Sequence, residues 1–123
     1  MRHITPTLAF GFHAEDRWIS RFTRFQADLP PGRHRLMGEI YCPPLHELAG
    51  NELQLAMNSR PLGSVLAAEP PRWHSFTLDL PALAEAQRCH LLLRTTRFFC
   101  PPPPEDRLLG LLLDNFLIAL NFD

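Results

Sequence analysis

Residues 98–120 read FFCPPPPEDRLLGLLLDNFLIAL, and this stretch decides the fold. Its four consecutive prolines cannot donate hydrogen bonds to a neighbouring strand, so they end the preceding element and form an extended connector. The residues that follow are apolar on both alternating sets of side chains: one set holds Leu109, Leu111, Leu113 and Leu117, and the other holds Leu108, Leu112, Phe116 and Ile118. We therefore expect a strand at the centre of the core that is covered on both faces.

Residues 108–120 could also form a buried helix, because periodicity does not separate helix from strand when nearly every position is apolar. Gly110 and the pair Asp114-Asn115 weaken a helix, and several strand-like segments precede this one. The strand is therefore the preferred interpretation. We expect it to lie beside the first strand and to close a two-layer domain whose chain ends are neighbours.

The composition is that of one ordinary globular domain spanning residues 1–123. Apolar residues make up 46% of the chain and charged residues 20%, which argues against disorder. The net charge is -1, so we expect neither a nucleic-acid partner nor a membrane partner. All twelve basic residues are arginine, which reflects either codon usage in the source genome or the use of arginine for planar, bidentate contacts.

The cysteines and the apolar runs bear on the compartment. Cys42, Cys89 and Cys100 are odd in number and match no paired metal spacing. No run of signal-peptide length precedes the first strand, and residues 108–113 are too few to span a bilayer. The expectation is a reduced, cytoplasmic protein with free thiols.

Thirteen prolines separate apolar segments of strand length, a rhythm typical of antiparallel all-β domains. We predict a two-sheet β-sandwich (jelly roll) of about eight strands and one or two short helical turns. A bulge or break is expected between Phe22 and Phe25, and a hairpin at Asn58-Ser59. The helical turns are expected at residues 46–50 and 81–87, and a turn at Pro70-Pro71. The predicted strands cover residues 7–12, 17–29, 35–41, 53–57, 62–66, 73–80, 90–96 and 108–120.

Three patches of the sequence together resemble a known family. They are residues 11–20 with Gly11-Phe12 and Glu15-Asp16-Arg17-Trp18, residues 55–62 with Asn58-Ser59, and residues 98–110 ending in Asp106-Arg107-Leu108-Leu109-Gly110. Their order is similar to that in small β-sandwich domains found in or beside bacterial glycosyltransferases and other surface-polysaccharide proteins. The last motif is one residue tighter than the family pattern, and Ser59 stands where glycine is usual.

This resemblance implies a jelly-roll sandwich akin to carbohydrate-binding modules and galactose-binding-like domains, which lack catalytic machinery of their own. It implies a glycan ligand and a glycosyltransferase partner as expectations. Ligand contact is not inherited with the motif, because the tryptophan and the Asp-Arg pair can serve structure alone.

Two tryptophan-centred patches are the candidate ligand contacts. Sugar binding uses a flat aromatic ring under the apolar side of a pyranose, with nearby charged or amide groups holding the hydroxyls. Trp73 lies between Arg72 and His74, and we take these three residues as the first patch. Trp73 follows a Pro-Pro turn, which favours an exposed position.

The second patch consists of Trp18, Arg17 and Glu15. The alternative is that Trp18 packs in the core or at a strand edge, which is the more frequent fate of a strand tryptophan. Glu15 is also expected to form a partly buried ion pair with Arg107 that joins the first turn to the last strand.

No metal or other cofactor is predicted. Asp106, Asp114 and Glu15 could supply oxygens to Ca²⁺, but no dense acidic run supports such a site. The six histidines show none of the spacings typical of transition-metal sites.

The sequence lacks a Gly-x-Ser-x-Gly elbow and a phosphate-binding glycine loop, so an enzyme is not expected. The preferred function is a non-catalytic, carbohydrate-binding-like module that recognises a glycan or serves a glycosyltransferase system. The alternative is a protein–protein interaction or homo-oligomerisation domain, motivated by Phe98-Phe99 and the apolar last strand.

Overall fold

The computed structural model describes residues 2–67, 72–105 and 107–121, and these form an all-β fold with one 3₁₀ turn. All strand pairs are antiparallel, so the predicted fold class is confirmed. The elements are β1 Arg2–Ile4, β2 Thr7–His13, β3 Trp18–Leu29, β4 Arg35–Tyr41, η1 His46–Leu48, β5 Glu52–Met57, β6 Arg60–Leu66, β7 His74–Asp79, β8 Gln87–Thr95 and β9 Leu109–Leu120. The strands number nine rather than eight, because residues at the start of the chain pair with the last strand.

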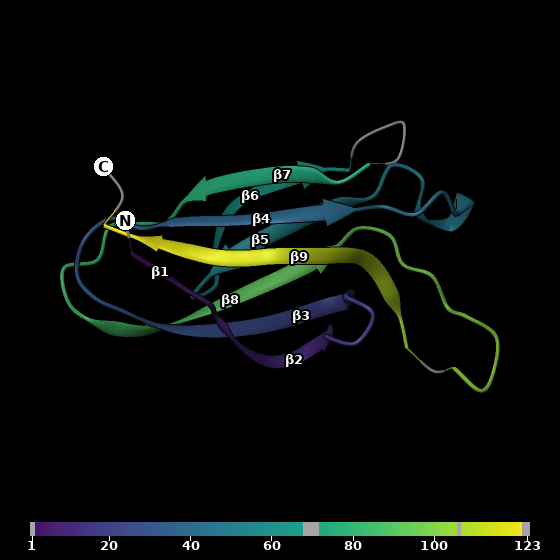
Figure 1. Ribbon diagram of the computed structural model, residues 1–123, viewed down its shortest axis with the longest axis horizontal. Coiled ribbons are helices and arrows are strands. Elements are labelled where there is room, and N and C mark those ends of the chain that lie inside the picture. The colour runs from purple at the N-terminus through teal and green to yellow at the C-terminus, as the bar shows by residue number, and fades with distance from the viewer. Residues whose placement is uncertain (1, 68–71, 106, 122–123) are drawn as a thin grey trace.

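The strands form one curled, nearly closed sheet in the order β6-β5-β8-β3-β9-β4-β7, with β1 paired to β9 and β2 to β3. In Figure 1, β7, β4 and β9 form the near layer, and β6, β5 and β8 lie behind them. The two free edges come close, because a Cβ placed on Gly63 of β6 would lie 3.5 Å from Leu78 Cδ2 of β7. The two layers of the predicted sandwich are therefore joined through β3 and β9.

The last segment is a strand, and the helical alternative is wrong. β9 pairs along one edge with β4 and along the other with β3 and then β1. Arg2 lies opposite Leu120, so the described ends of the chain are neighbours, as Figure 1 shows. This confirms that the strand lies in the middle of the sheet and closes the domain.

The prediction that β9 is covered on both faces is wrong. Leu109, Leu111 and Leu113 are buried, but the inward set then changes to Phe116, Ile118 and Leu120. The change occurs at a bulge, where the register with β4 shifts between Met37 and Glu39 and Asn115 has φ 49°. On the outer face Leu112 and Leu117 stay half-buried and Leu108 is 40% exposed.

The irregularity expected in β3 is confirmed, and it lies opposite Gly11. Phe10 pairs with Arg24 and Phe12 with Ile19, so four residues of β3 face one residue of β2. Gly11 has φ 95°, and a Cβ there would lie 2.5 Å from the carbonyl oxygen of Phe22. Only glycine fits this close approach of the two backbones.

The predicted hairpin is confirmed: Asn58 and Ser59 have φ 50° and 69°, the positive values that a two-residue hairpin loop of type I′ requires. The helical turn within residues 46–50 is also confirmed as η1. The helical turn at residues 81–87 is wrong, because Leu83 exchanges two backbone hydrogen bonds with Gly32 and so forms a bridge. The turn at Pro70-Pro71 lies outside the described residues.

The core lies between the layers and is mainly aliphatic. Its fully buried side chains include Ile19, Leu36, Ile40, Leu53, Leu91, Leu93, Leu111 and Ile118. No helix in the described ranges has the length and apolarity that crossing a membrane requires.

Asn51 is a buried polar junction at the end of this core where β9 begins. Its side chain is fully buried and donates to the carbonyl oxygens of Arg97 and Gly110, both at 3.1 Å. Its Oδ1 accepts from the Arg97 N–H at 2.8 Å and from Thr96 Oγ1 at 3.3 Å. One side chain thus ties the start of β5 to the end of β8 and the start of β9.

Replacing Asn51 with Ala should strongly destabilise the protein. The change leaves the buried Gly110 carbonyl and the part-buried carbonyl and N–H of Arg97 without this partner, which costs about 2–4 kcal/mol in the free energy of unfolding. Chemical denaturation monitored by circular dichroism measures this cost. Asn58→Ala is not a suitable control because of its turn conformation, so the matched control is the exposed Ser75→Ala, which should change stability little. Equal midpoints for Asn51→Ala and wild type would contradict the assigned role.

The three cysteines are free and differ in exposure: Cys100 is exposed, Cys42 half-buried and Cys89 buried. Burial raises the pKa of the Cys89 thiol, so less of it is thiolate at a given pH. In a kinetic assay with an aromatic disulfide reagent, Cys100 should react fast, and Cys89 only after unfolding. Cys100→Ser should remove the fast phase, and Cys89→Ala should keep it. A fast phase that persists in Cys100→Ser would contradict this assignment.

Candidate functional site

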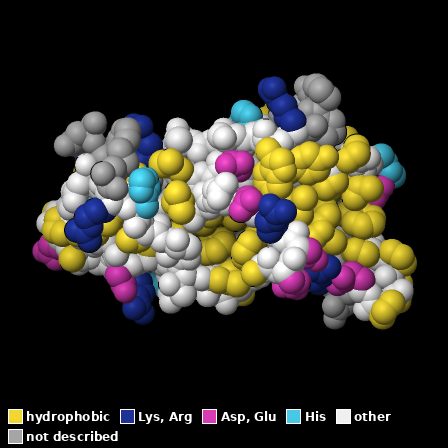
Figure 2. All heavy atoms as spheres, in the orientation of Figure 1, with side chains coloured by type: hydrophobic (Ala, Val, Ile, Leu, Met, Phe, Trp, Pro, Cys, Tyr) yellow, Lys and Arg dark blue, Asp and Glu magenta, His cyan; other side chains and the backbone are white. Residues whose placement is uncertain are grey.

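Three aromatic side chains surround Leu112 on the outer face of the sheet, and we call this group of four residues the aromatic platform. Trp18 of β3 and Tyr41 of β4 lie opposite Leu112 of β9 on its two sides, so the three side chains point the same way. Trp73, which precedes β7, packs its ring against Tyr41 at a centroid distance of 5.6 Å. Figure 2 shows hydrophobic side chains gathered on this face, at the end of the molecule where β9 begins.

Trp73 is the most accessible ring that the sequence singled out. It is 39% exposed, whereas Trp18 and Tyr41 are half-buried. The prediction that Trp73 is exposed is therefore confirmed. The Arg17 guanidinium carbon lies 5.5 Å from its ring centroid, a cation–π distance.

Arg17 joins the two patches that the sequence kept apart. It has φ 65°, and its carbonyl oxygen accepts from the Leu113 N–H at 2.9 Å. Its Nη1 donates to Asp114 Oδ2 at 2.7 Å. The guanidinium group therefore lies between Asp114 of β9 and the Trp73 ring, and the Arg17 side chain remains 52% exposed.

A chain of polar groups continues from Arg17 along the platform. Asp114 Oδ1 accepts from the backbone N–H of Asn115 at 2.8 Å, and Asn115 Nδ2 donates to Glu39 Oε1 at 2.8 Å. The β9 bulge completes this arrangement, because it turns Asn115 toward the surface beside Asp114. Hydrogen-bond donors and acceptors thus border the aromatic rings on one side.

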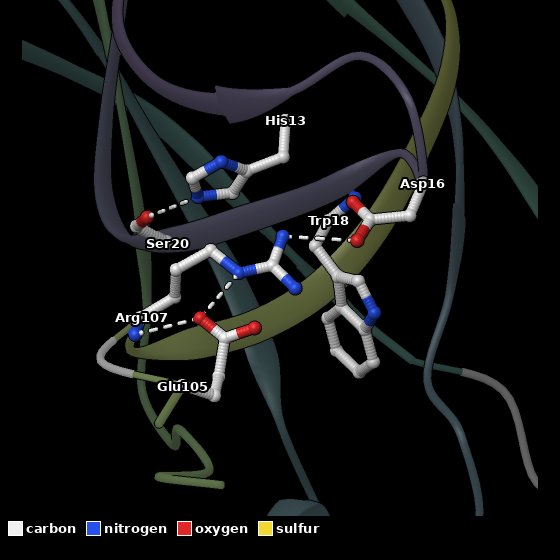
Figure 3. Close-up of polar contacts among 6 residues, drawn as sticks. All are labelled: His13, Asp16, Trp18, Ser20, Glu105 and Arg107. Carbon is white, nitrogen blue, oxygen red and sulfur yellow. Dashed lines mark hydrogen bonds and ion pairs between the residues drawn. The ribbon is translucent and has the colours of Figure 1, made fainter. Parts of the chain in front are cut away.

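Arg107 lies near the Trp18 end of the platform. Its Nη1 donates to Asp16 Oδ2 at 2.9 Å and its Nε to Glu105 Oε1 at 2.7 Å, as Figure 3 shows. These hydrogen bonds, first to Glu105 and then to Asp16, raise the pKa of Arg107. The prediction that Glu15 pairs with Arg107 is wrong, because Asp16 of the same turn bonds Arg107 instead. The predicted connection between the first turn and the start of β9 is confirmed.

Of the other predicted ligand residues, the structure places His74 away from the platform. His74 lies opposite Ile40 and has the same parity as the buried Phe76, so its side chain is on the inner side of the sheet, away from Tyr41. Arg72 and Glu15 are exposed. The contact of these residues with a ligand stays a prediction.

The sequence interpretation missed Tyr41, Leu112, Asn115 and Glu39 as site residues. The alternation in residues 35–41 did place Tyr41 and Glu39 on one face, but the partner strand was needed to show what lies beside them. Only the register and the bulge bring Asn115 to Glu39.

Groups of His, Cys, Asp or Glu with the spacing for a metal ion do not occur among the described residues. Asp106, one of the three considered for Ca²⁺, is outside the described ranges. Asp114 instead bonds Arg17, and nothing places it near Glu15.

No protein-family model matches the sequence, and no curated protein is significantly similar to it. The fold is similar to a part of dimeric latent PorU from Porphyromonas gingivalis, with a TM-score of 0.52 and 7% identity over 96% of this chain and 13% of that chain. It is also similar to a part of a Paenibacillus xanthan lyase, with a TM-score of 0.51 and 14% identity over 96% of this chain and 12% of that chain. At these identities the likeness is one of fold alone.

A weaker likeness connects the chain to TmCBM61, solved in complex with β-1,4-galactotriose. The TM-score is 0.45 and the identity 13%, over 84% of this chain and 67% of that chain. This score is too low to indicate a common fold. The chain spans about an eighth of the length of PorU and of the xanthan lyase.

Proposed function

We propose that the protein is a non-catalytic glycan-binding module and that the aromatic platform is its saccharide site. The observation that carries the proposal is the gathering of Trp18, Tyr41 and Trp73 on one outer face, bordered by charged and amide side chains. Saccharide sites combine these two features, because a pyranose has an apolar side and a rim of hydroxyl groups.

Each part of the platform has a defined role in this proposal. Trp73 and Tyr41 offer tilted rings, 39° apart, which give a shallow apolar support rather than a deep pocket. Arg17 supplies N–H donors beside the Trp73 ring, and Asp114 supplies acceptor oxygens. Because Arg17 and Asp114 bond each other, their positions are fixed before a ligand arrives, which reduces the entropy lost on binding.

The proposal extends to the biological setting. The sequence resembles β-sandwich domains found in or beside bacterial glycosyltransferases, and we propose that the module serves such a system or another surface-polysaccharide system. The fold's likeness to a part of a xanthan lyase is in keeping with this setting.

The alternative of a self-association domain gains no support from an edge of β9. β9, the apolar strand that suggested it, is hydrogen-bonded along both edges within the chain. Glycan binding at the platform is therefore the better supported of the two functions.

Trp73→Ala should weaken binding of the recognised glycan by about tenfold or more, because it removes the most exposed ring on which the sugar stacks. The measurement is calorimetric titration of the full chain with neutral oligosaccharides that first give a signal in a glycan array. Phe10→Ala is the matched control, since Phe10 is 50% exposed and lies on β2, away from the platform. Thermal melting shows whether both variants are folded.

Two results would count against the proposal. Silence of the wild-type protein across a broad array of neutral and acidic glycans would remove glycan binding as a function. Binding that Trp73→Ala and Tyr41→Ala both leave unchanged would keep the function but take it away from the platform.

A further inference from the structure

A groove lies on the outer face of the opposite layer, and we call it the β5–β6–β8 groove. Its volume is about 450 Å³, within the size range of small-ligand sites. Small residues on β5 and β6 hollow the face between larger ones on β6 and β8. Its lining includes Gln54, Ala56, Pro61, Ser64, Leu92 and Arg94.

The strand register orders this groove into two rows. Phe22, Arg94, Gln54 and Ser64 lie opposite one another across β3, β8, β5 and β6, and their side chains share the outer face. The next row along the same strands contains Leu92 and Ala56. One row is therefore polar with an aromatic end, and the other has an apolar floor at Leu92 and Ala56 beside Arg24 of β3.

Positive charge dominates around the groove. Arg94 is the single charged residue among the described lining residues, and its guanidinium carbon lies 5.9 Å from the Phe22 ring centroid. Arg21 lies 5.2 Å from the same centroid. Arg24 occupies the neighbouring row, and Glu52, two positions from Gln54 on β5, is the nearest acidic residue along that strand.

Arg24 adds a positive charge whose N–H donors are only partly hydrogen-bonded within the protein. Its Nη2 lies 2.7 Å from His90 Nδ1, which is the acceptor in this pair. Its Nε is buried and has no hydrogen-bond partner within the described part of the chain. Arg24 is half-buried, and its incompletely bonded guanidinium adds to the positive potential on this face.

We infer that the β5–β6–β8 groove binds an acidic saccharide through the carboxylate of a uronic acid unit. Arg94 offers the planar pair of N–H donors that matches a carboxylate. Gln54 and Ser64, beside it in the row, can bond the neighbouring ring hydroxyls. Leu92 is 40% exposed and Phe22 43% exposed, and they provide apolar surface for the sugar ring.

This inference rests on the proposed glycan-binding function but concerns a different face of the protein. The platform mixes arginines with carboxylates, as in Arg17–Asp114, whereas no carboxylate lines the described part of the groove. A neutral saccharide therefore suits the platform, and an acidic one suits the groove. Variants of the two faces separate the two proposals.

The test is titration of the full chain with oligogalacturonate and with the same oligosaccharide after reduction of its carboxyl groups. We expect the acidic form to bind and the reduced form to bind at least about tenfold more weakly, since the reduced form lacks the carboxylate that accepts charge-assisted hydrogen bonds from Arg94. Arg94→Gln should reduce binding of the acidic form by a similar factor. Arg94→Lys should fall between the two, because it keeps the charge and loses the paired donors.

Arg88→Gln is the matched control, because Arg88 is exposed on the same strand and the same charge is removed away from the groove. It should leave binding of the acidic form unchanged, and so should Trp73→Ala. Equal affinity of the wild-type protein for the acidic and reduced forms would overturn the inference. So would equal losses of affinity for the acidic form in Arg94→Gln and Arg88→Gln. A loss of that affinity in Trp73→Ala, with the affinity of Arg94→Gln unchanged, would overturn it as well. So would a dimer in sedimentation equilibrium that Phe22→Asp converts to a monomer, since a second copy would then occupy this face.

Discussion

The fold depends on the pairing of β9, one strand with three partners. A strand that is hydrogen-bonded on both edges must have its inward side chains buried, and those of β9 pack in the core between the two layers of the curled sheet. Gly110 permits this close packing, because a Cβ there would lie 2.5 Å from Thr95 Oγ1 of β8. The buried amide of Asn51 then bonds the Gly110 carbonyl and holds the start of the strand.

The β9 bulge connects this fold to the candidate site. Without the extra residue, Asn115 would continue the inward alternation of Leu111 and Leu113, and a polar side chain would enter the core. With the bulge, Phe116 takes the inward place and packs 4.8 Å from the Phe25 ring. Asp114 and Asn115 are left on the surface, where they bond Arg17 and Glu39. The same backbone irregularity therefore completes the core and supplies the polar border of the platform.

The two outer faces differ in charge although they share one sheet. At the platform Arg17 is bonded to Asp114 and Arg107 to Asp16 and Glu105, so each arginine there is paired with a carboxylate. On the other layer Arg21 and Arg94 lie over Phe22, and the groove beside them has no acidic lining residue within the described ranges. The chain has a net charge of -1, but its two outer faces differ in how their arginines are paired with carboxylates.

The sequence by itself determined the all-β class, most strand positions, the Asn58-Ser59 hairpin and the central place of residues 108–120, because these follow from local alternation, turn residues and proline positions. It also indicated that Trp73 is exposed. The tertiary structure alone decided that Arg17 lies over Trp73, that Asp16 rather than Glu15 bonds Arg107, and that Asn115 bonds Glu39. Those outcomes depend on strand register and on a single extra residue in β9, which shift side chains between faces without changing the local pattern of apolar and polar residues.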